Sequence, residues 1–237
     1  LVSGLALGAP QADAAPIYTF DTTAGSGSGT NELTFTATGF PSVVLKARAS
    51  WTSTGSSSST FSNTGATLTI YGSNGFGLNN GSSDSTSPQH AIDNNGRKDF
   101  VLFEFAGNNY DPISFKIGYK DTDADIQFWI GNSNTASLNL ATACSGPCSI
   151  SGLAALGFTA LTSFSDVPTN TTENFNTSLA GRYLLVSGNL SDTNDYFKIS
   201  QLVGTTIPEP ASFALFGFGL AGMAGAGGLT RRRTARA

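Results

Sequence analysis

Charged residues are scarce in this chain of 237 residues, at only 12% of the total, and it contains one histidine and one methionine. The supply of Glu, Lys and Leu is too small for a bundle of amphipathic helices. A hydrophobic content of 39%, with 11% aromatic residues, is too high for a chain that stays unfolded. Gly, Ser, Thr and Asn fill much of the rest, and this composition favours β-structure with long polar loops.

Cysteine is rare as well, because only Cys144 and Cys148 occur, separated by Ser-Gly-Pro. A structural zinc site normally takes four ligands, and a single histidine cannot complete the set. A thioredoxin-type motif has two intervening residues, whereas this one has three. We therefore expect a local disulfide, which persists in an oxidising compartment, and the alternative is a pair of reduced thiols in a loop.

Positive charge is sparse in the body of the chain. Four of the twelve basic residues are arginines in the last seven positions. Between residues 15 and 207, eight lysines and arginines stand against fourteen acids, which gives a net charge of −6. Phosphate binding needs a basic footprint, so nucleic acid is not expected as a partner.

The first fourteen residues look like the end of a secretory apolar region followed by an Ala12-Asp13-Ala14 cleavage signal. Neither a methionine nor a basic segment precedes them. Either the sequence begins inside a longer product or its start was assigned late. We predict that residues 1–14 are the remnant of a signal peptide, with a flexible Ala-rich terminus as the alternative.

The C-terminal end combines three features in a fixed order. They are Pro208-Glu209-Pro210, the twenty uncharged residues 211–230, and then Arg231, Arg232 and Arg233. Twenty helical residues can cross a hydrocarbon core of about 30 Å, and the arginines should stay on the cytoplasmic side. We expect one C-terminal transmembrane helix, with the preceding chain outside the cytoplasm.

These features closely resemble the PEP-CTERM sorting signal of exopolysaccharide-producing Gram-negative bacteria, over residues 206–237. The resemblance implies an exported protein, first anchored in the inner membrane and then released or transferred to the cell surface by an exosortase that recognises Pro-Glu-Pro. The prolines bar helix continuation, so this element should be extended and accessible above the membrane. A permanent tail anchor is the alternative that the same residues support.

Residues 15–205 should form one folded domain. Residues 113–120 alternate between apolar and small or basic side chains, which is typical of a half-buried strand. Residues 100–105 are apolar on both faces, which suits a central strand covered by a second sheet. Further strands are predicted at 17–22, 32–38, 43–51, 66–71, 126–130, 183–188 and 196–202. We expect a mainly β domain, an antiparallel β-sandwich of which the jelly roll is one form. Residues 153–161 are the one candidate helix, and a buried apolar loop is the alternative.

Two groups of acidic residues suggest a calcium site. Asn95-Gly96 predicts a turn across which Asp93 and Asp99 could approach each other. Asp121, Asp123 and Asp125 alternate between two predicted strands, and hard cations prefer such oxygen ligands. The spacing does not fit an EF-hand. A solvated acidic turn that keeps a strand edge soluble is the alternative.

The segment that carries Asp93 and Asp99 shows a second resemblance. It reads His-Ala-x-Asp-Asn-x-Gly-x-x-Asp-x-x-Leu-x-x-Phe from His90 to Phe105, similar to a class of exosortase-dependent surface proteins of unassigned activity. The likeness therefore implies no reaction.

The sequence offers few residue combinations that are typical of a catalytic site. His90 is the one histidine, and no Gly-x-Ser-x-Gly elbow accompanies it. Glu104, Glu173 and the aspartates supply carboxylates for glycoside hydrolysis, but sequence spacing does not give the separation that this chemistry needs. A sugar-stacking platform could be built from aromatic side chains that β-proteins more often bury, namely Trp51, Trp129, Tyr71, Tyr110 and Tyr119.

We therefore expect an exported bacterial surface or extracellular-matrix protein without catalytic activity of its own. Its expected partners are an exosortase, the inner membrane and exopolysaccharide, and calcium is the one cofactor that the residues suggest. Two alternatives stay open. One is a secreted calcium- or carbohydrate-binding module associated with exopolysaccharide, and the other is a secreted hydrolase.

Overall fold

The computed structural model describes residues 15–24, 29–81, 90–105, 109–133 and 135–206. These residues form a single compact unit that ends at Thr206 and consists almost entirely of strands. The strands are β1 (Ile17–Asp21), β2 (Glu32–Ala37), β3 (Phe40–Thr52), β4 (Thr67–Ile70), β5 (Phe76–Asn79), β6 (Ile92–Asp93), β7 (Lys98–Phe105), β8 (Tyr110–Lys120), β9 (Ile126–Gly131), β10 (Phe158–Ala160), β11 (Glu173–Asn174), β12 (Tyr183–Gly188) and β13 (Tyr196–Thr206). Two 3-10 helices, η1 (Gly72–Asn74) and η2 (Ser151–Leu156), complete the described elements.

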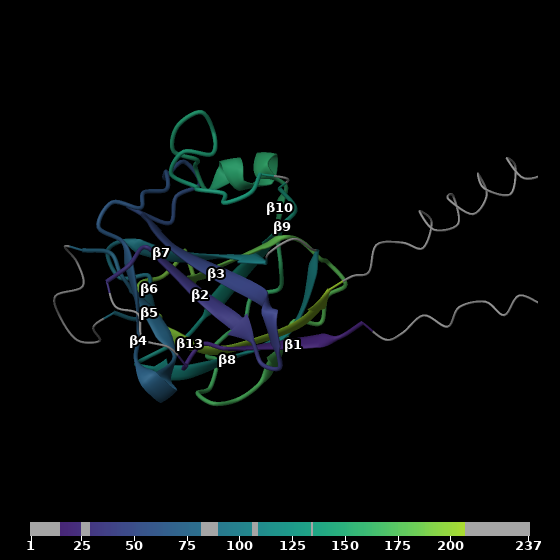
Figure 1. The fold of residues 1–237 in the computed structure, drawn as a ribbon. Coiled ribbons are helices and arrows are strands. Elements are labelled where there is room, and N and C mark those ends of the chain that lie inside the picture. The colour runs from purple at the N-terminus through teal and green to yellow at the C-terminus, as the bar shows by residue number, and fades with distance from the viewer. Residues whose placement is uncertain (1–14, 25–28, 82–89, 106–108, 134, 207–237) are drawn as a thin grey trace, which may run out of the picture. The chain divides into compact units, whose positions relative to one another are not determined.

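The strands form two antiparallel sheets, which lie one above the other in Figure 1. Sheet A has the order β11-β8-β13-β5-β4, and β1 and β6 also pair with β13. Sheet B has the order β10-β9-β12-β7-β3-β2. The chain changes sheet repeatedly, since β7 and β9 belong to sheet B and β8 between them to sheet A. The prediction of a mainly β domain with two antiparallel sheets is confirmed.

The main core lies between the two sheets, because one buried cluster draws side chains from both. Phe76 of sheet A meets Phe103 of sheet B edge to face, with ring centroids 5.9 Å apart. Phe115 of β8 in sheet A also contacts Phe128 of β9 in sheet B, with ring centroids 4.8 Å apart. Burying one such ring stabilises the fold by about 1.5–3 kcal/mol, so these contacts hold the sheets together.

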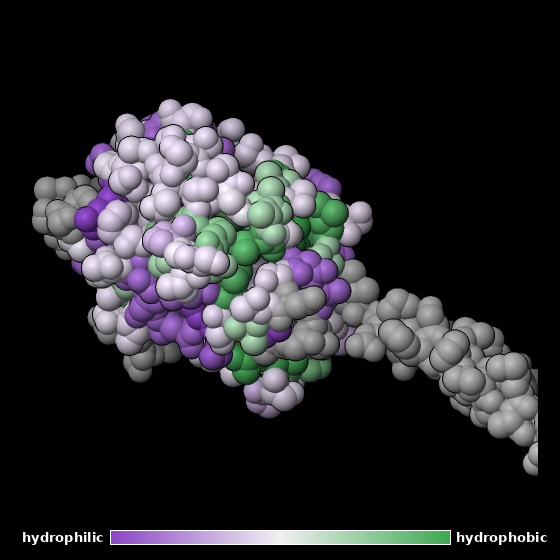
Figure 2. Space-filling model, turned by 90° about the horizontal axis from the view of Figure 1, so that it is seen from above, coloured by the Kyte–Doolittle hydropathy of each residue, from purple (hydrophilic) through white to green (hydrophobic). Residues whose placement is uncertain are grey.

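A second buried cluster covers the outer face of sheet B. There, Phe100 and Leu102 of β7 pack with Leu153 of η2 and Cys148, whereas Val101 and Phe103 face the main core. All eight residues of β7 are therefore buried. The prediction of a central strand covered by a second sheet is confirmed on the face of Val101 and Phe103, and loops around η2 cover the other face. Figure 2 shows this side of the molecule, where mostly pale residues of intermediate hydropathy form the outermost layer.

All nine predicted strands are present, with ends displaced by up to four residues. The strands that the sequence did not reveal, β5, β6, β10 and β11, have four residues or fewer. The candidate helix at 153–161 is only partly present. The 3-10 helix η2 ends at Leu156, and the left-handed conformation of Gly157 (φ 82°) turns the chain into β10, which pairs with β9.

Three predictions fall outside the described residues: the signal-peptide remnant at 1–14, the transmembrane helix at 211–230 and the sorting motif on either side of that helix. Within the part of the chain that the structure describes, no helix has both the length and the apolar character needed to span a bilayer.

Candidate functional site

Buried polar residues concentrate at the end of the sandwich where β13 begins. We call this region the acidic end and define it by Asp93, Asp99, Asp123, Asp125, Asp192 and Asp195. Asp195 and Asp99 are fully buried, and Asp93 is 3% exposed. Buried carboxyl groups are tolerated only where hydrogen bonds or charges compensate for lost water, so each one needs identified partners.

The turn before β7 brings Asp93 and Asp99 together, as the sequence predicted. The backbone N–H of Asn95 donates to the Asp93 carboxylate at 2.9 Å, and Gly96 has the positive φ (75°) that closes the turn. The N–H of Asp93 then donates to an Asp99 carboxylate oxygen at 3.3 Å. The other Asp99 oxygen accepts from Asn80 Nδ2 at 2.9 Å. The pair thus closes the turn through hydrogen bonds.

Asp195 holds three separate loops together. Its Oδ1 accepts the N–H of Asp125 at 2.7 Å. Its Oδ2 accepts the N–H of Asn189 at 2.8 Å and the side-chain amide of Asn94 at 2.5 Å. Burial raises the pKa of the Asp195 carboxyl to about 7, although these backbone donors favour its charged form.

Lys98 supplies positive charge to this region. Its ammonium group donates to the backbone carbonyls of Asn94 (2.6 Å) and Asp192 (2.5 Å). Burial lowers the pKa of Lys98, while the charges of Asp192, Asp195 and Asp93 act in the opposite direction. The acidic end therefore contains a buried cation as well as buried carboxylates.

The structure divides the predicted calcium ligands. Asp123 and Asp125 each place a carboxylate oxygen within 4.8 Å of the others in a trio completed by Asp195, which the sequence analysis missed. Asp121 is exposed and is not in the trio, and Asp93 and Asp99 form the separate pair described above. Asp195 could have been suspected only from its place in the polar segment just before a strongly predicted strand.

The trio has the right oxygen chemistry for a hard cation, but protein donors already engage it. Calcium takes six to eight oxygen ligands, so three carboxylates would need carbonyls or water in addition. Asp123 accepts from the N–H of Ala124 (2.8 Å) and from Asn194 Nδ2 (3.0 Å). Asp125 accepts from the N–H of Asp166 at 2.7 Å. In this structure, the Asp123 and Asp125 carboxylates serve as hydrogen-bond acceptors within and between loops.

A second buried polar network surrounds Glu104 in the middle of sheet B. Its carboxylate accepts from Arg48 and Arg182, each at 2.7 Å, and from the N–H of Ser137 at 3.1 Å. Burial alone would raise the pKa of Glu104, but these donors outweigh it and leave the pKa lowered. The Tyr183 hydroxyl also donates to it, at 3.3 Å. Glu104 is 4% exposed, so we assign it a structural role.

The aromatic residues proposed as a sugar platform do not gather on one surface. Tyr110 is buried in the main core. The ring centroids of Tyr71 and Tyr119 lie 4.5 and 4.1 Å from the Lys198 ammonium, on the side of sheet A. Trp51 and Trp129 belong to β3 and β9 of sheet B, which are not neighbours. His90 stacks on Tyr71 with ring centroids 5.9 Å apart.

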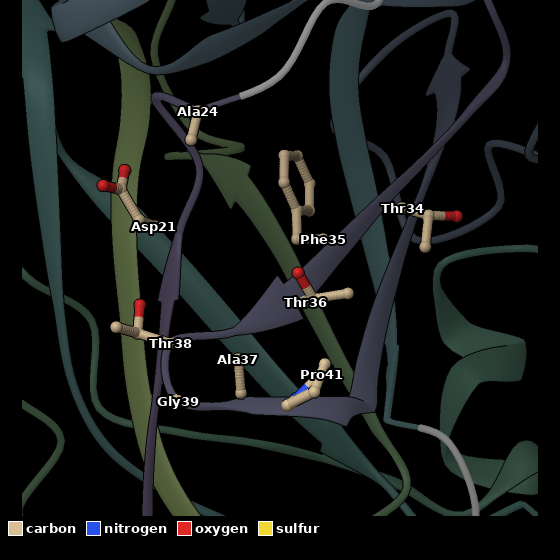
Figure 3. A pocket seen from close by; sticks show the side chains of 9 residues that line it. All are labelled: Asp21, Ala24, Thr34, Phe35, Thr36, Ala37, Thr38, Gly39 and Pro41. Carbon is tan, nitrogen blue, oxygen red and sulfur yellow. The ribbon is translucent and has the colours of Figure 1, made fainter.

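A hollow of about 600 Å³ lies between β1 and the hairpin of β2 and β3 (Figure 3). Threonines, Phe35 and Pro41 line much of it, and its one ionisable side chain is Asp21. The Asp21 carboxylate accepts from the backbone N–H and hydroxyl of Thr23. General acid–base chemistry usually needs a second positioned group, so this lining indicates no reaction.

Cys144 and Cys148 form the predicted disulfide, with Cα atoms 5.0 Å apart. The predicted sorting residues, Pro208, Glu209, Pro210, Arg231, Arg232 and Arg233, lie outside the described residues. Comparisons with known proteins add no identity: no protein-family model, curated protein or solved structure matches this chain.

Proposed function

We propose that this chain is an exported bacterial surface or extracellular-matrix protein, sorted through its C-terminal tail and without catalytic activity of its own. The observation that carries the proposal is the order of Pro208-Glu209-Pro210, twenty uncharged residues and an arginine cluster at the C-terminal end. In this proposal residues 211–230 form a transmembrane helix in the precursor, and an exosortase acts at the Pro-Glu-Pro element. The product then resides among exopolysaccharide at the cell surface.

Two features of the domain support the proposal, one for the extracellular destination and one for the lack of catalysis. A disulfide persists only where the surroundings are oxidising. The buried acids Asp99, Asp195 and Glu104 are engaged in hydrogen bonds that hold strands and loops together, which favours a structural role over catalysis.

Mass spectrometry of the protein from its native host tests the proposal. We expect the mature C-terminus near Pro210, with residues 211–237 removed. A variant with Pro208→Ala and Pro210→Ala should keep Arg236 and accumulate in the inner membrane. Full-length wild-type protein that is soluble in the cytosol, with both ends intact, would overturn the proposal, and full-length protein in the membrane would favour a permanent anchor.

Calcium binding is a second candidate function, favoured by the convergence of the Asp123, Asp125 and Asp195 oxygens within 4.8 Å. A ligand that binds only the folded state raises the melting temperature. Calcium should therefore stabilise the wild-type protein and the control Asp121→Asn, whose carboxylate is outside the trio, but not Asp125→Asn. Equal responses of the two variants, or no heat on calorimetric titration, would rule out this site.

A further inference from the structure

The described residues include four exposed large hydrophobic side chains. They are Ile17, Phe40, Ile113 and Leu179, with exposed fractions of 61%, 39%, 37% and 43%. Single exposed hydrophobic residues are common and need no explanation. What is informative here is their position, because they come from four segments that are far apart in the sequence.

All four lie at the end of the sandwich where β13 ends. Ile17 pairs with Thr205, the penultimate residue of β13. Ile113 lies between Pro112 and Ser114, whose partners in β13 are Gly204 and Val203.

The other two are placed by their neighbours. The Phe40 ring packs edge to face on Tyr18, the second residue of β1, with centroids 5.0 Å apart. Leu179 lies two residues before Gly181, which exchanges two backbone hydrogen bonds with Tyr110. Tyr110 in turn pairs with Thr206, the last residue of β13. We call these four residues the apolar rim, and Figure 1 shows β1 starting and β13 ending on this side.

The acidic end lies at the opposite end of the same strand. Tyr196, the first residue of β13, pairs with Asp93, and its N–H donates to the Asp123 carbonyl at 3.0 Å. Eleven strand residues extend over roughly 35 Å. Apolar and acidic groups are thus separated along one axis of the domain. At the rim itself, burial raises the pKa of the Asp111 carboxyl above its ordinary value.

The length of the connection to the tail decides which end of the domain can face a membrane. Only residues 207–210 separate β13 from the uncharged run that begins at Ala211. Fully extended, the chain from Thr206 to Ala211 spans at most about 18 Å. If Ala211 enters lipid, the rim is held close to the lipid surface while the acidic end is about 35 Å further along β13. Such a short tether gives a high effective concentration, so a weakly apolar surface is enough for contact.

We propose that the apolar rim is a lipid-docking surface, which seats the β-domain on the bilayer while the tail is in the membrane. This inference rests on the proposed function, since it needs residues 211–230 to insert. Docking would orient the acidic end away from anionic headgroups and fix the Pro-Glu-Pro element at the membrane surface. It would end when the tail is cut, because the tether is then lost.

The full chain in vesicles tests this inference. The vesicles contain phosphatidylethanolamine and a minority of phosphatidylglycerol, with a fraction of the lipids brominated on the acyl chains to quench nearby tryptophans. Phe40→Trp places a probe in the rim, and Thr122→Trp places a matched probe at an exposed position of the acidic end. We expect the Phe40→Trp signal, after subtraction of the wild-type background from Trp51 and Trp129, to be quenched at least twofold more than that of Thr122→Trp.

A second variant tests whether the other exposed side chains of the rim are needed for the quenching. Ile17→Ser with Leu179→Ser, in the Phe40→Trp chain, removes exposed side chains only and should reduce the quenching at least twofold with an unchanged circular dichroism spectrum. If the chain floats with the vesicles but the two probes are quenched equally, docking is wrong while membrane insertion stands. Failure to float overturns both. An unquenched probe with concentration-dependent crosslinking would assign the rim to a second copy instead, which also overturns the proposal.

Discussion

Replacing Glu104 by alanine should strongly destabilise the domain, because it leaves two guanidinium groups without their buried counter-ion. The Arg48 and Arg182 side chains are 13% and 25% exposed, against 6% for Glu104. Removing one partner of a buried ion pair costs about 3–5 kcal/mol. We expect the lower end, about 3 kcal/mol, because Arg48 keeps a second partner in Glu32 at 2.6 Å and Arg182 can hydrate.

Denaturation by guanidinium chloride, followed by fluorescence and circular dichroism, measures this loss as a shift in midpoint at constant slope. A change of about 3 kcal/mol corresponds to a fall in melting temperature of roughly 6–12 °C for a domain of this size. The matched control is Glu32→Ala. Glu32 also pairs with Arg48 and with Lys46, but its side chain is 39% exposed, so the expected cost is about 0–1 kcal/mol.

The pH dependence gives an independent check. The pKa of Glu104 is lower in the folded state than in the unfolded chain, so its stabilisation is present above the unfolded value, about 4.3, and is lost as the pH falls through the folded value. The difference between wild type and Glu104→Gln should therefore shrink in acid. A Glu104→Ala variant no less stable than Glu32→Ala, or a difference that grows in acid, would refute this account.

Three further changes test other parts of the structure. Burial raises the pKa of Asp195 to about 7, so between about pH 4 and pH 7 the folded state keeps a proton that the unfolded chain releases. The free energy of unfolding should therefore fall as the pH rises over this range. In thermal melts, Asp195→Asn should make stability depend less on pH. Gly75→Ala should lower the free energy of unfolding in urea by about 3 kcal/mol, because the new Cβ would lie 2.0 Å from the Ile199 carbonyl oxygen. The control Gly65→Ala has open space around the new Cβ, so only its positive φ should count, at about 1 kcal/mol. Replacing Cys144 and Cys148 by serine together should lower stability by about 2 kcal/mol, as expected for a short closed loop, and an unchanged midpoint would contradict this.

The sequence alone determined the features that depend on local patterns. Alternation of apolar and polar residues located the long strands, since side chains of a strand point to opposite faces in turn, and Asn95-Gly96 predicted the turn that joins Asp93 to Asp99. The export and sorting hypothesis likewise rests on the sequence of the two ends.

Only the tertiary structure decided which distant residues meet. Alternation tells which face a side chain occupies but not which strand lies beside it, so nothing local joined Asp195 to Asn94, 101 positions away, or to Asp125, 70 positions away. For the same reason the loops around η2 could not be foreseen as the cover of β7, because an apolar face specifies that something must bury it and not what does. The apolar rim arises in this way too, from four segments that strand pairing, ring packing and loop hydrogen bonds bring to one end of the sandwich.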